Sequence, residues 1–226
     1  MRHAGNPWRH SESYYRERPC LYYETIGKGK PRGICGSGLI DTIAELFRNR
    51  IIDPNGKFPR GSSNPQIRTT DRDTEFVLVP GSETETGNDV VITENDISNL
   101  IKSKAAILAA MRVLLNSVGL SFADLGKIFV AGGFGNYLNV EKAIFIGLLP
   151  DVPIERIQFI GNSSLTGARM ALLSRHAFAR AKNLASQMTY FELSVNQDFM
   201  NEFVASLFLP HTDMNLFPTV RSLLIT

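Results

Sequence analysis

The stretch Lys127 to Asn136, K-I-F-V-A-G-G-F-G-N, joins a short apolar run to three closely spaced glycines. An apolar strand that ends in glycines just before a helix leaves bare backbone where a phosphate or a ribose can approach closely. A second unit of the same form, I-Q-F-I-G-N-S-S, occupies Ile157 to Ser164. The two strand–glycine–helix units predict an α/β fold in which parallel strands carry a nucleotide site.

The glycine loop itself fits neither of the common phosphate-binding motifs. Its third glycine comes too early for G-x-G-x-x-G, and no Gly-Lys-Ser/Thr follows it. Spacing alone leaves two interpretations open: a nucleotide contact, or a tight strand–helix turn that only glycine can make. The glycine-rich entry Gly33–Gly38 poses the same choice, and there close packing with Ser37 as the helix cap is favoured over a phosphate site.

The composition indicates an ordinary globular protein. A chain of 226 residues, 43% hydrophobic and with a net charge of +2, excludes disorder and a strongly basic nucleic-acid binder. The apolar runs are too short to span a membrane, and no apolar signal-peptide core follows Met1, so we expect a cytoplasmic protein. Cys20 and Cys35 are expected to be reduced thiols, and no Cys, His, Asp or Glu spacing predicts a metal site.

The amino-terminal half predicts a lead-in followed by a lobe. Residues 1–32 are basic, with seven Arg or Lys against three Asp or Glu, and Leu21–Ile26 is a candidate edge strand. Residues 33–226 form the predicted lobe, which begins with an amphipathic helix that ends before Asp53. Residues 66–93 predict a small antiparallel insertion with strands at Glu75–Val79 and Asp89–Thr93. A capping box of Thr93 and Asp96 then predicts a long helix over 94–118.

The carboxyl-terminal half predicts the parallel strands and a tail. Ile128–Ala131 is apolar without alternation, as expected of a strand covered on both faces. We further expect helices over Val140–Leu148, capped by Asn139, and over 165–186, capped by Ser163 or Ser164. The tail, 189–226, is expected to pack on the body, with a strand at Thr189–Leu193 and a helix at Gln197–Leu207.

Lys102 and Lys104 are the charged candidates on the long helix. Ile101 and Ala105 mark its buried stripe, so both lysines are expected to flank that stripe. They would either reach over a cleft to a nucleotide or lie on a solvated face. His176 and His211 are interpreted as structural or surface residues, and no catalytic residue is identified.

Five motifs in order resemble one family, the reductive activators of corrinoid proteins. The resemblance is to the carboxyl-terminal region of these activators, and it covers roughly residues 20–220. The motifs are R-G-I-C-G-S-G-L-I-D (32–41), D-I-S-N-L-I-K-S-K-A-A-I (96–107), F-V-A-G-G-F-G-N-Y-L-N (129–139), I-G-N-S-S-L-T-G-A (160–168) and F-V-A-S-L-F-L-P-H-T-D (203–213).

The resemblance implies an ATPase domain of the superfamily that contains acetate and sugar kinases, heat-shock chaperones and actin. ATP and Mg²⁺ would lie between two ribonuclease-H-like lobes, and an iron-sulfur module would precede them. It places the loop Gly132–Gly133–Phe134–Gly135 in the adenosine motif and Lys102 and Lys104 on a helix beside the adenine and ribose. Gly161 and Asn162 open the next strand–helix turn. A corrinoid protein is the implied partner.

Two departures from the family bear on activity. The sequence contains no D-x-G-T phosphate hairpin and no iron-sulfur cysteine set. We therefore expect a fragment, a ribonuclease-H-like lobe that lacks its first strand hairpin and awaits an amino-terminal lobe. Such a chain should bind ATP no tighter than roughly 0.1–1 mM and should not turn it over. A homodimer paired across the open sheet edge is a further expectation.

Two other functions remain open at this point. The chain could be a non-catalytic interaction module of the same fold, with the basic segment and the apolar tail as contact surfaces. A small-molecule kinase lobe is the weaker alternative, because no phosphate loop supplies a catalytic Asp.

Overall fold

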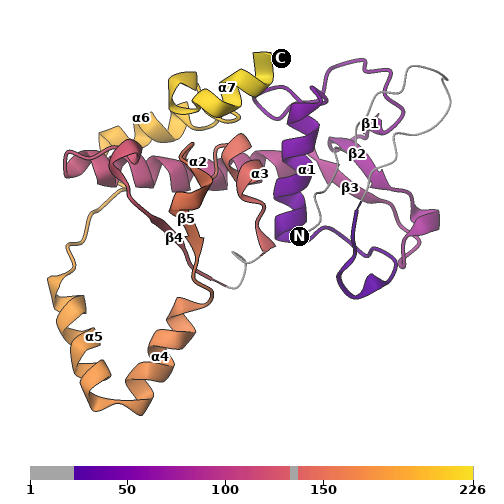
Figure 1. The fold of residues 1–226 in the computed structure, drawn as a ribbon. Coiled ribbons are helices and arrows are strands. Elements are labelled where there is room, and N and C mark those ends of the chain that lie inside the picture. Colours follow the sequence, from indigo (N-terminus) through magenta and orange to yellow (C-terminus); the bar gives the residue numbers. More distant parts are fainter. Residues whose placement is uncertain (1–22, 133–136, 226) are drawn as a thin grey trace.

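The computed structural model describes residues 23–132 and 137–225, and two small sheets with helices around them make up the described chain (Figure 1). The first sheet is antiparallel, in the order β1-β2-β3, and the second is the parallel pair β4-β5. The expected strand at Leu21–Ile26 does not form in its described part, where Ile26–Lys28 is a 3-10 turn. The division of the chain at residue 32 stays a prediction.

Helix α1, Gly36–Arg48, begins in the glycine-rich segment. Its cap is Cys35, whose Sγ accepts from the Gly38 N–H, and not Ser37 as the sequence predicted. Ile43 and Phe47 are buried as the apolar periodicity requires. Glu45 is buried as well, and its carboxylate lies 3.2 Å from Nζ of Lys142 in the neighbouring helix.

The predicted small antiparallel sheet is confirmed, with a first strand, β1, that the sequence analysis did not predict. Strands β1 (Ile67–Thr69), β2 (Thr74–Val79) and β3 (Val90–Thr93) form one sheet, with an irregularity between Val77 and Val79. Helix α2, Glu94–Ser117, follows β3 directly. Its first turn has the predicted capping box, since Thr93 Oγ1 accepts from the Asp96 N–H at 3.0 Å and the Asp96 carboxylate accepts from Thr93.

The second sheet confirms the predicted parallel pairing. Strands β4 (Ile128–Val130) and β5 (Ile157–Phe159) run side by side, and helix α3 (Val140–Phe145) lies between them in the sequence. Asn139 caps α3 as expected, but the helix ends at Phe145, not at Leu148. The prediction that both faces of β4 are covered is wrong, because the Phe129 side chain is 58% exposed.

The single helix expected over 165–186 is two helices. Helices α4 (Ser163–Leu173) and α5 (Arg175–Gln187) are separated at Ser174, whose extended backbone ends the first and whose hydroxyl caps the second at the Ala177 N–H. Asn162, not Ser163 or Ser164, caps α4. Together these helices project from the body as a hairpin (Figure 1).

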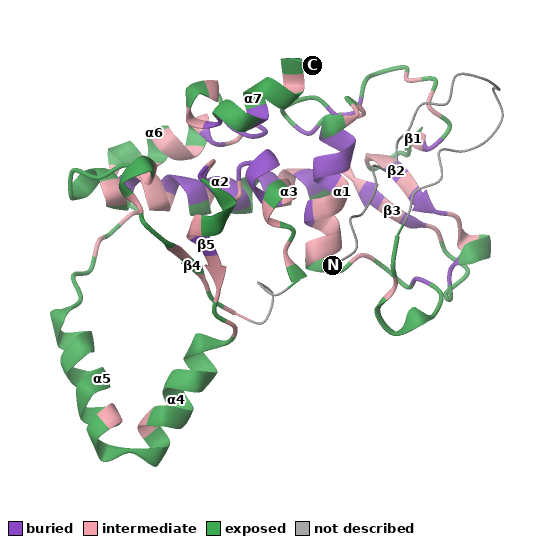
Figure 2. Cartoon of the chain, in the orientation of Figure 1, coloured by how far each residue is buried: buried purple, intermediate pink, exposed green. Residues whose placement is uncertain are grey.

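The remaining chain returns to the body through α6 (Gln197–Ala205) and α7 (Pro218–Ile225). The expected strand at Thr189–Leu193 does not form. Helix α6 packs on α2, and Leu209, Phe217 and Val220 are buried in the same core as α1, α2 and α3. Figure 2 shows this buried core at the junction of α1, α2, α3 and the carboxyl-terminal segment. Among the described helices, none is both long and apolar enough to cross a bilayer.

Candidate nucleotide site

Strands β4 and β5 end side by side, and each is followed two residues later by a glycine, Gly132 or Gly161. The Ile160 N–H donates to the Val130 carbonyl at 3.1 Å, and the Gly132 N–H donates to the Gly161 carbonyl at 2.7 Å. Gly132 has φ +116° and Gly161 has φ +66°, both in the left-handed region that side chains disfavour. Within the described residues, a Cβ at either position would meet nothing within 4 Å. The backbone turn, and not crowding by any part of the chain that the structure describes, therefore selects glycine at both positions.

Asn162 completes this edge by starting α4. Its Oδ1 accepts from the Leu165 N–H at 3.0 Å, which fixes the first turn of the helix next to Gly161. We predicted Ser163 or Ser164 as the cap because serine is also a common N-cap residue and both follow Asn162 directly. From Ile157 to Phe191 there is no Asp or Glu, so the positive end of the α4 dipole has no carboxylate nearby in the sequence to neutralise it. Phosphate groups bind well at such helix ends.

The structure brings together only part of the predicted site. Gly132, Gly161 and Asn162 lie at the ends of adjacent strands. Gly133, Phe134 and Gly135 lie outside the described residues.

The two lysines of α2 have different environments. Lys102 is exposed, which fits both interpretations left open for it, a contact across a cleft and a solvated helix face. The expectation that Lys104 flanks the buried stripe is wrong, because its side chain is fully buried. Its Nζ donates to the carbonyl oxygens of Phe208 at 2.5 Å and Pro210 at 2.6 Å. Burial lowers the pKa of Lys104 to about 7, while the two carbonyl acceptors favour its charged form.

A second polar contact holds the same tail segment. Glu202 of α6 accepts from Arg112 of α2 at 2.5 Å and lies 3.0 Å from Nε2 of the buried His211. Burial opposes ionisation of Glu202, but the hydrogen bonds from His211 and Arg112 outweigh it and hold the pKa of Glu202 below its ordinary value. His211 is thus structural, in line with the sequence interpretation.

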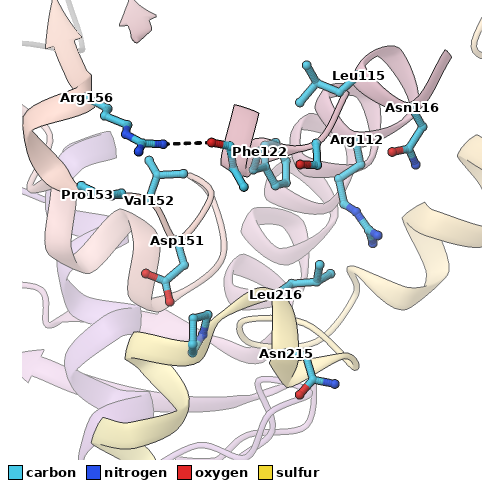
Figure 3. Close-up of a pocket in the computed structure, with 13 residues that line it drawn as sticks. Arg112, Leu115, Asn116, Phe122, Asp151, Val152, Pro153, Arg156, Asn215 and Leu216 are labelled. Carbon is cyan, nitrogen blue, oxygen red and sulfur yellow. Dashed lines mark hydrogen bonds between the residues drawn. The ribbon is translucent and has the colours of Figure 1, made fainter. Parts of the chain in front are cut away.

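A pocket of about 450 Å³ lies elsewhere, between the end of α2, the turn at Phe122 and the residues before β5 (Figure 3). Its charged groups are already engaged. Arg156 donates to the carbonyls of Ala123 and Leu125 at 3.1 Å, Asp151 accepts from the Thr219 N–H, and Arg112 donates to Glu202. Because Phe122 precedes β4 and Arg156 precedes β5, the pocket lies at the amino ends of the strands. Ligands of open α/β sheets bind at the carboxyl ends, where the glycines are.

One more cluster joins α1 to α3. Lys142 Nζ lies 3.2 Å from Glu45 and 3.8 Å from Asp41, and burial raises the pKa of Asp41 despite the nearby lysine. Among the described residues, no group of three or more His, Cys, Asp or Glu is arranged to hold a metal ion. The cluster is best explained as a packing contact between the two helices.

Comparisons with known proteins agree with this architecture. The profile of the family described as the C-terminal domain of RACo, the ASKHA domain, matches residues 14–221. A solved structure of a reductive activator for corrinoid, iron-sulfur protein superposes with a TM-score of 0.82 at 52% identity. The match covers 88% of this chain and 32% of that one.

Two curated relatives carry corresponding names. The corrinoid activation enzyme RamQ of Eubacterium limosum is 35% identical over 191 residues, which are 81% of this chain and 32% of that protein. The [Co(II) methylated amine-specific corrinoid protein] reductase of Methanosarcina barkeri is 27% identical over 177 residues, which are 77% of this chain and 29% of that protein. The chain thus spans about a third of the length of its relatives.

These matches confirm the predicted α/β class and superfamily, and the small antiparallel sheet with a parallel pair is consistent with a ribonuclease-H-like lobe. The family match covers most of the chain in a single block. The chain therefore belongs to the RACo family, and its fold is that of the carboxyl-terminal ASKHA domain of these reductive activators.

Proposed function

We propose that this chain supplies the adenosine-binding side of an ATP-dependent reductive activator of a corrinoid protein. In the whole protein, nucleotide binding would close two lobes on ATP and Mg²⁺, and an iron-sulfur module would deliver the electron to cobalt. The phosphate hairpins and the iron-sulfur cysteines are not in this sequence, so this chain would contribute one wall of the nucleotide site. We place the protein in the cytoplasm.

The observation that carries the proposal is the pair of left-handed glycines at adjacent strand ends. Gly132 and Gly161 are linked by a hydrogen bond and lack side chains, and none of the other described residues lies within 4 Å of where a Cβ would stand. A ribose or an α-phosphate can approach backbone only where no Cβ stands in the way. The predicted contacts of Gly133, Phe134 and Gly135 would extend this surface along the loop that follows Gly132.

The electrostatics of the edge support the same ligand. Asn162 begins α4, an eleven-residue helix, directly beside Gly161. The amino end of a helix carries about half a positive charge, which favours a phosphate group. Lys102 is the exposed candidate for a further contact with the nucleotide, whereas Lys104 would first have to leave two carbonyl acceptors.

Replacement of Asn162 by Asp tests the proposal without removing the helix cap. Asp caps a helix as well as Asn does, so α4 should remain, but a carboxylate would now stand where the phosphate is expected. The control is Asn196→Asp, the same change at the cap of α6. We expect Asn162→Asp to weaken ATP binding by roughly fivefold or more, given a charge effect near 1 kcal/mol, and the control to leave it unchanged. Equal binding by the two variants would contradict the proposal.

A non-catalytic interaction module is the second candidate. The projecting hairpin of α4 and α5 favours it, because neither helix has a buried residue. The two functions are separated by Gly132→Val. If Gly132 lies in a nucleotide site, the variant should lose ATP binding. If the chain is only an interaction module, the variant should keep every partner contact, and ATP should bind neither the variant nor the wild type. The control is Gly126→Val, at the amino end of the same strand, where an added Cβ would also meet nothing and φ is ordinary.

A further inference from the structure

A second pocket, of about 580 Å³, lies beside the antiparallel sheet. It is larger than the pocket of Figure 3, at about 450 Å³, and its size is that of small-molecule sites, which span roughly 300–1,000 Å³. Its lining comes from the loop segment 57–62, from strands β1 and β2, and from the first residue of α2. Its lining includes no residue of β4, β5 or α4, so this pocket is separate from the proposed nucleotide edge.

The carboxylate in the lining, Glu94, already has two partners. Its Oε2 lies 2.8 Å from Nζ of Lys57, and its Oε1 accepts from the Phe58 N–H at 2.9 Å. An ammonium group has three N–H donors, so Lys57 keeps two for another acceptor, and its side chain is 56% exposed. With Lys57 and Arg60 against one Glu94, the charged groups of the lining sum to +1.

Arg60 is the charged lining residue whose donors are unused. Within residues 23–132 and 137–225, neither its guanidinium nor its backbone N–H has a hydrogen-bond acceptor, and the Gly61 N–H has none either. Gly61 has φ +68°, and an added Cβ would meet none of these residues within 4 Å. Turns with a left-handed residue and free N–H groups form concave anion sites, and here a guanidinium stands beside one.

The strand side of the pocket adds hydroxyls and an apolar wall. Thr69 and Thr74 are cross-strand partners, and their Oγ1 atoms lie 3.3 Å apart. Ile67 of β1 is half-buried, and the buried ring of Phe58 stacks on Phe76 with the ring centroids 6.4 Å apart. A bare inorganic ion would leave this wall without a contact. The lining therefore suits an anion that also carries an apolar group.

We propose that this pocket binds a small organic oxyanion. The guanidinium of Arg60 and the N–H groups of Arg60 and Gly61 hold the charged oxygens, with Lys57 as a further donor. The apolar part of the ligand lies against Phe58 and Ile67. Because Lys57 is also bound to Glu94, the first residue of α2, the ligand contacts the start of the long helix through this ion pair.

Calorimetric titration of the full chain with phenyl phosphate tests the proposal. We expect one saturable site whose affinity falls as sodium chloride is added, because the contact is between opposite charges. Inorganic phosphate should bind several-fold more weakly, since it lacks the ring, and phenol should not bind, since it lacks the charge. Absence of saturable phenyl phosphate binding would overturn the proposal, and so would equal affinity for phenyl phosphate and inorganic phosphate.

Replacement of Arg60 by Gln assigns the site. Arg60 is exposed, so the fold should persist, as circular dichroism would verify, while phenyl phosphate should bind roughly tenfold more weakly or worse. The control is Arg72→Gln, at an exposed arginine of the turn between β1 and β2 that does not line the pocket. It should leave the affinity unchanged. Equal affinity of the Arg60→Gln and Arg72→Gln variants would overturn the proposal.

Amide chemical shifts locate the bound ligand independently of the variants. Phenyl phosphate should shift the amides of Gly61, Thr69 and Thr74 most. The largest shifts at Gly132 and Asn162 would mean that the phosphate binds at the nucleotide edge, which would also overturn the proposal. Failure of ATP to bind at that edge would contradict the proposed function alone, because the two sites share no lining residue.

Discussion

The backbone N–H of Gly132 lies 2.7 Å from the carbonyl oxygen of Gly161 and joins the ends of the two parallel strands. Each glycine turns the chain out of its strand in the left-handed conformation. The hydrogen bond holds the two turns in register, so that Gly132 and the start of α4 lie next to each other. This is the geometry on which the proposed adenosine contact rests.

Gly147→Ala should destabilise the fold by about 2–4 kcal/mol. Gly147 has φ +77°, and an added Cβ would lie 2.2 Å from the carbonyl oxygen of Pro210. The clash is with backbone, so no side chain can move aside. Gly119→Ala is the matched control, with a similar φ of +72° and free space, and should cost only about 1 kcal/mol. Urea unfolding of the two variants measures the difference, and equal losses would contradict the close contact of the tail.

The pH dependence of stability should reveal the buried Lys104. Burial lowers its pKa to about 7, from 10.5, so between these values the unfolded chain binds a proton that the folded chain does not. The contribution of Lys104 to the free energy of unfolding therefore rises between pH 7 and 10.5, by up to about 1.4 kcal/mol per pH unit. Below about pH 7 this contribution does not change with pH. Urea unfolding at several pH values gives the slope.

Lys104→Met should abolish that rise and lower stability by about 1–3 kcal/mol at pH 10, because the carbonyls of Phe208 and Pro210 lose their donor. Lys102→Met changes an exposed lysine of the same helix and should leave the slope as it is. If the slope between pH 7 and 10 persists in Lys104→Met, the buried amine is not its source.

Glu202→Gln should destabilise the protein at neutral pH by about 1–3 kcal/mol, since the charged hydrogen bonds to Arg112 and His211 are lost. The folded-state pKa of Glu202 is lowered, so its stabilisation is present above its ordinary value near 4.5 and disappears as the pH falls through the folded value. The difference between wild type and variant should therefore shrink in acid. Asp198→Asn, on the exposed side of α6, serves as the control, and a difference that grows in acid would refute the assignment.

The sequence predicted those parts of the fold that depend on local signals. The capping box of Thr93 and Asp96 predicted the start of α2, and the two short strands expected within 66–93 predicted the antiparallel sheet, because both signals lie within a few residues of the elements they define. The division of α4 from α5 at Ser174 was missed, although the signal is local, since the apolar pattern runs through it. At this position the Ser174 hydroxyl, which caps α5, determines where the helix is broken, although the apolar periodicity continues.

Other features depend on residues far apart in the sequence. Lys104 is buried because its partners, the carbonyls of Phe208 and Pro210, are about a hundred residues away at a bend in the tail. A lysine beside an apolar stripe gives no sign of such acceptors. The exposure of Phe129 could not be predicted either, because an apolar run does not show whether one or both faces of its strand are covered. Of the predicted site, Gly132, Gly161 and Asn162 came from local strand–helix junctions, which explains why they lie together.

Titration of the ¹⁵N-labelled chain with ATP, followed by amide chemical shifts, tests the central claim most directly. We predict weak binding, at roughly 0.1–1 mM, with the largest shifts at Ala131, Gly132, Gly161 and Asn162. The shifts should be reduced in Asn162→Asp. Shifts confined to the pocket around Arg112 and Arg156, or binding at low micromolar ATP with the strand ends unperturbed, would contradict the account.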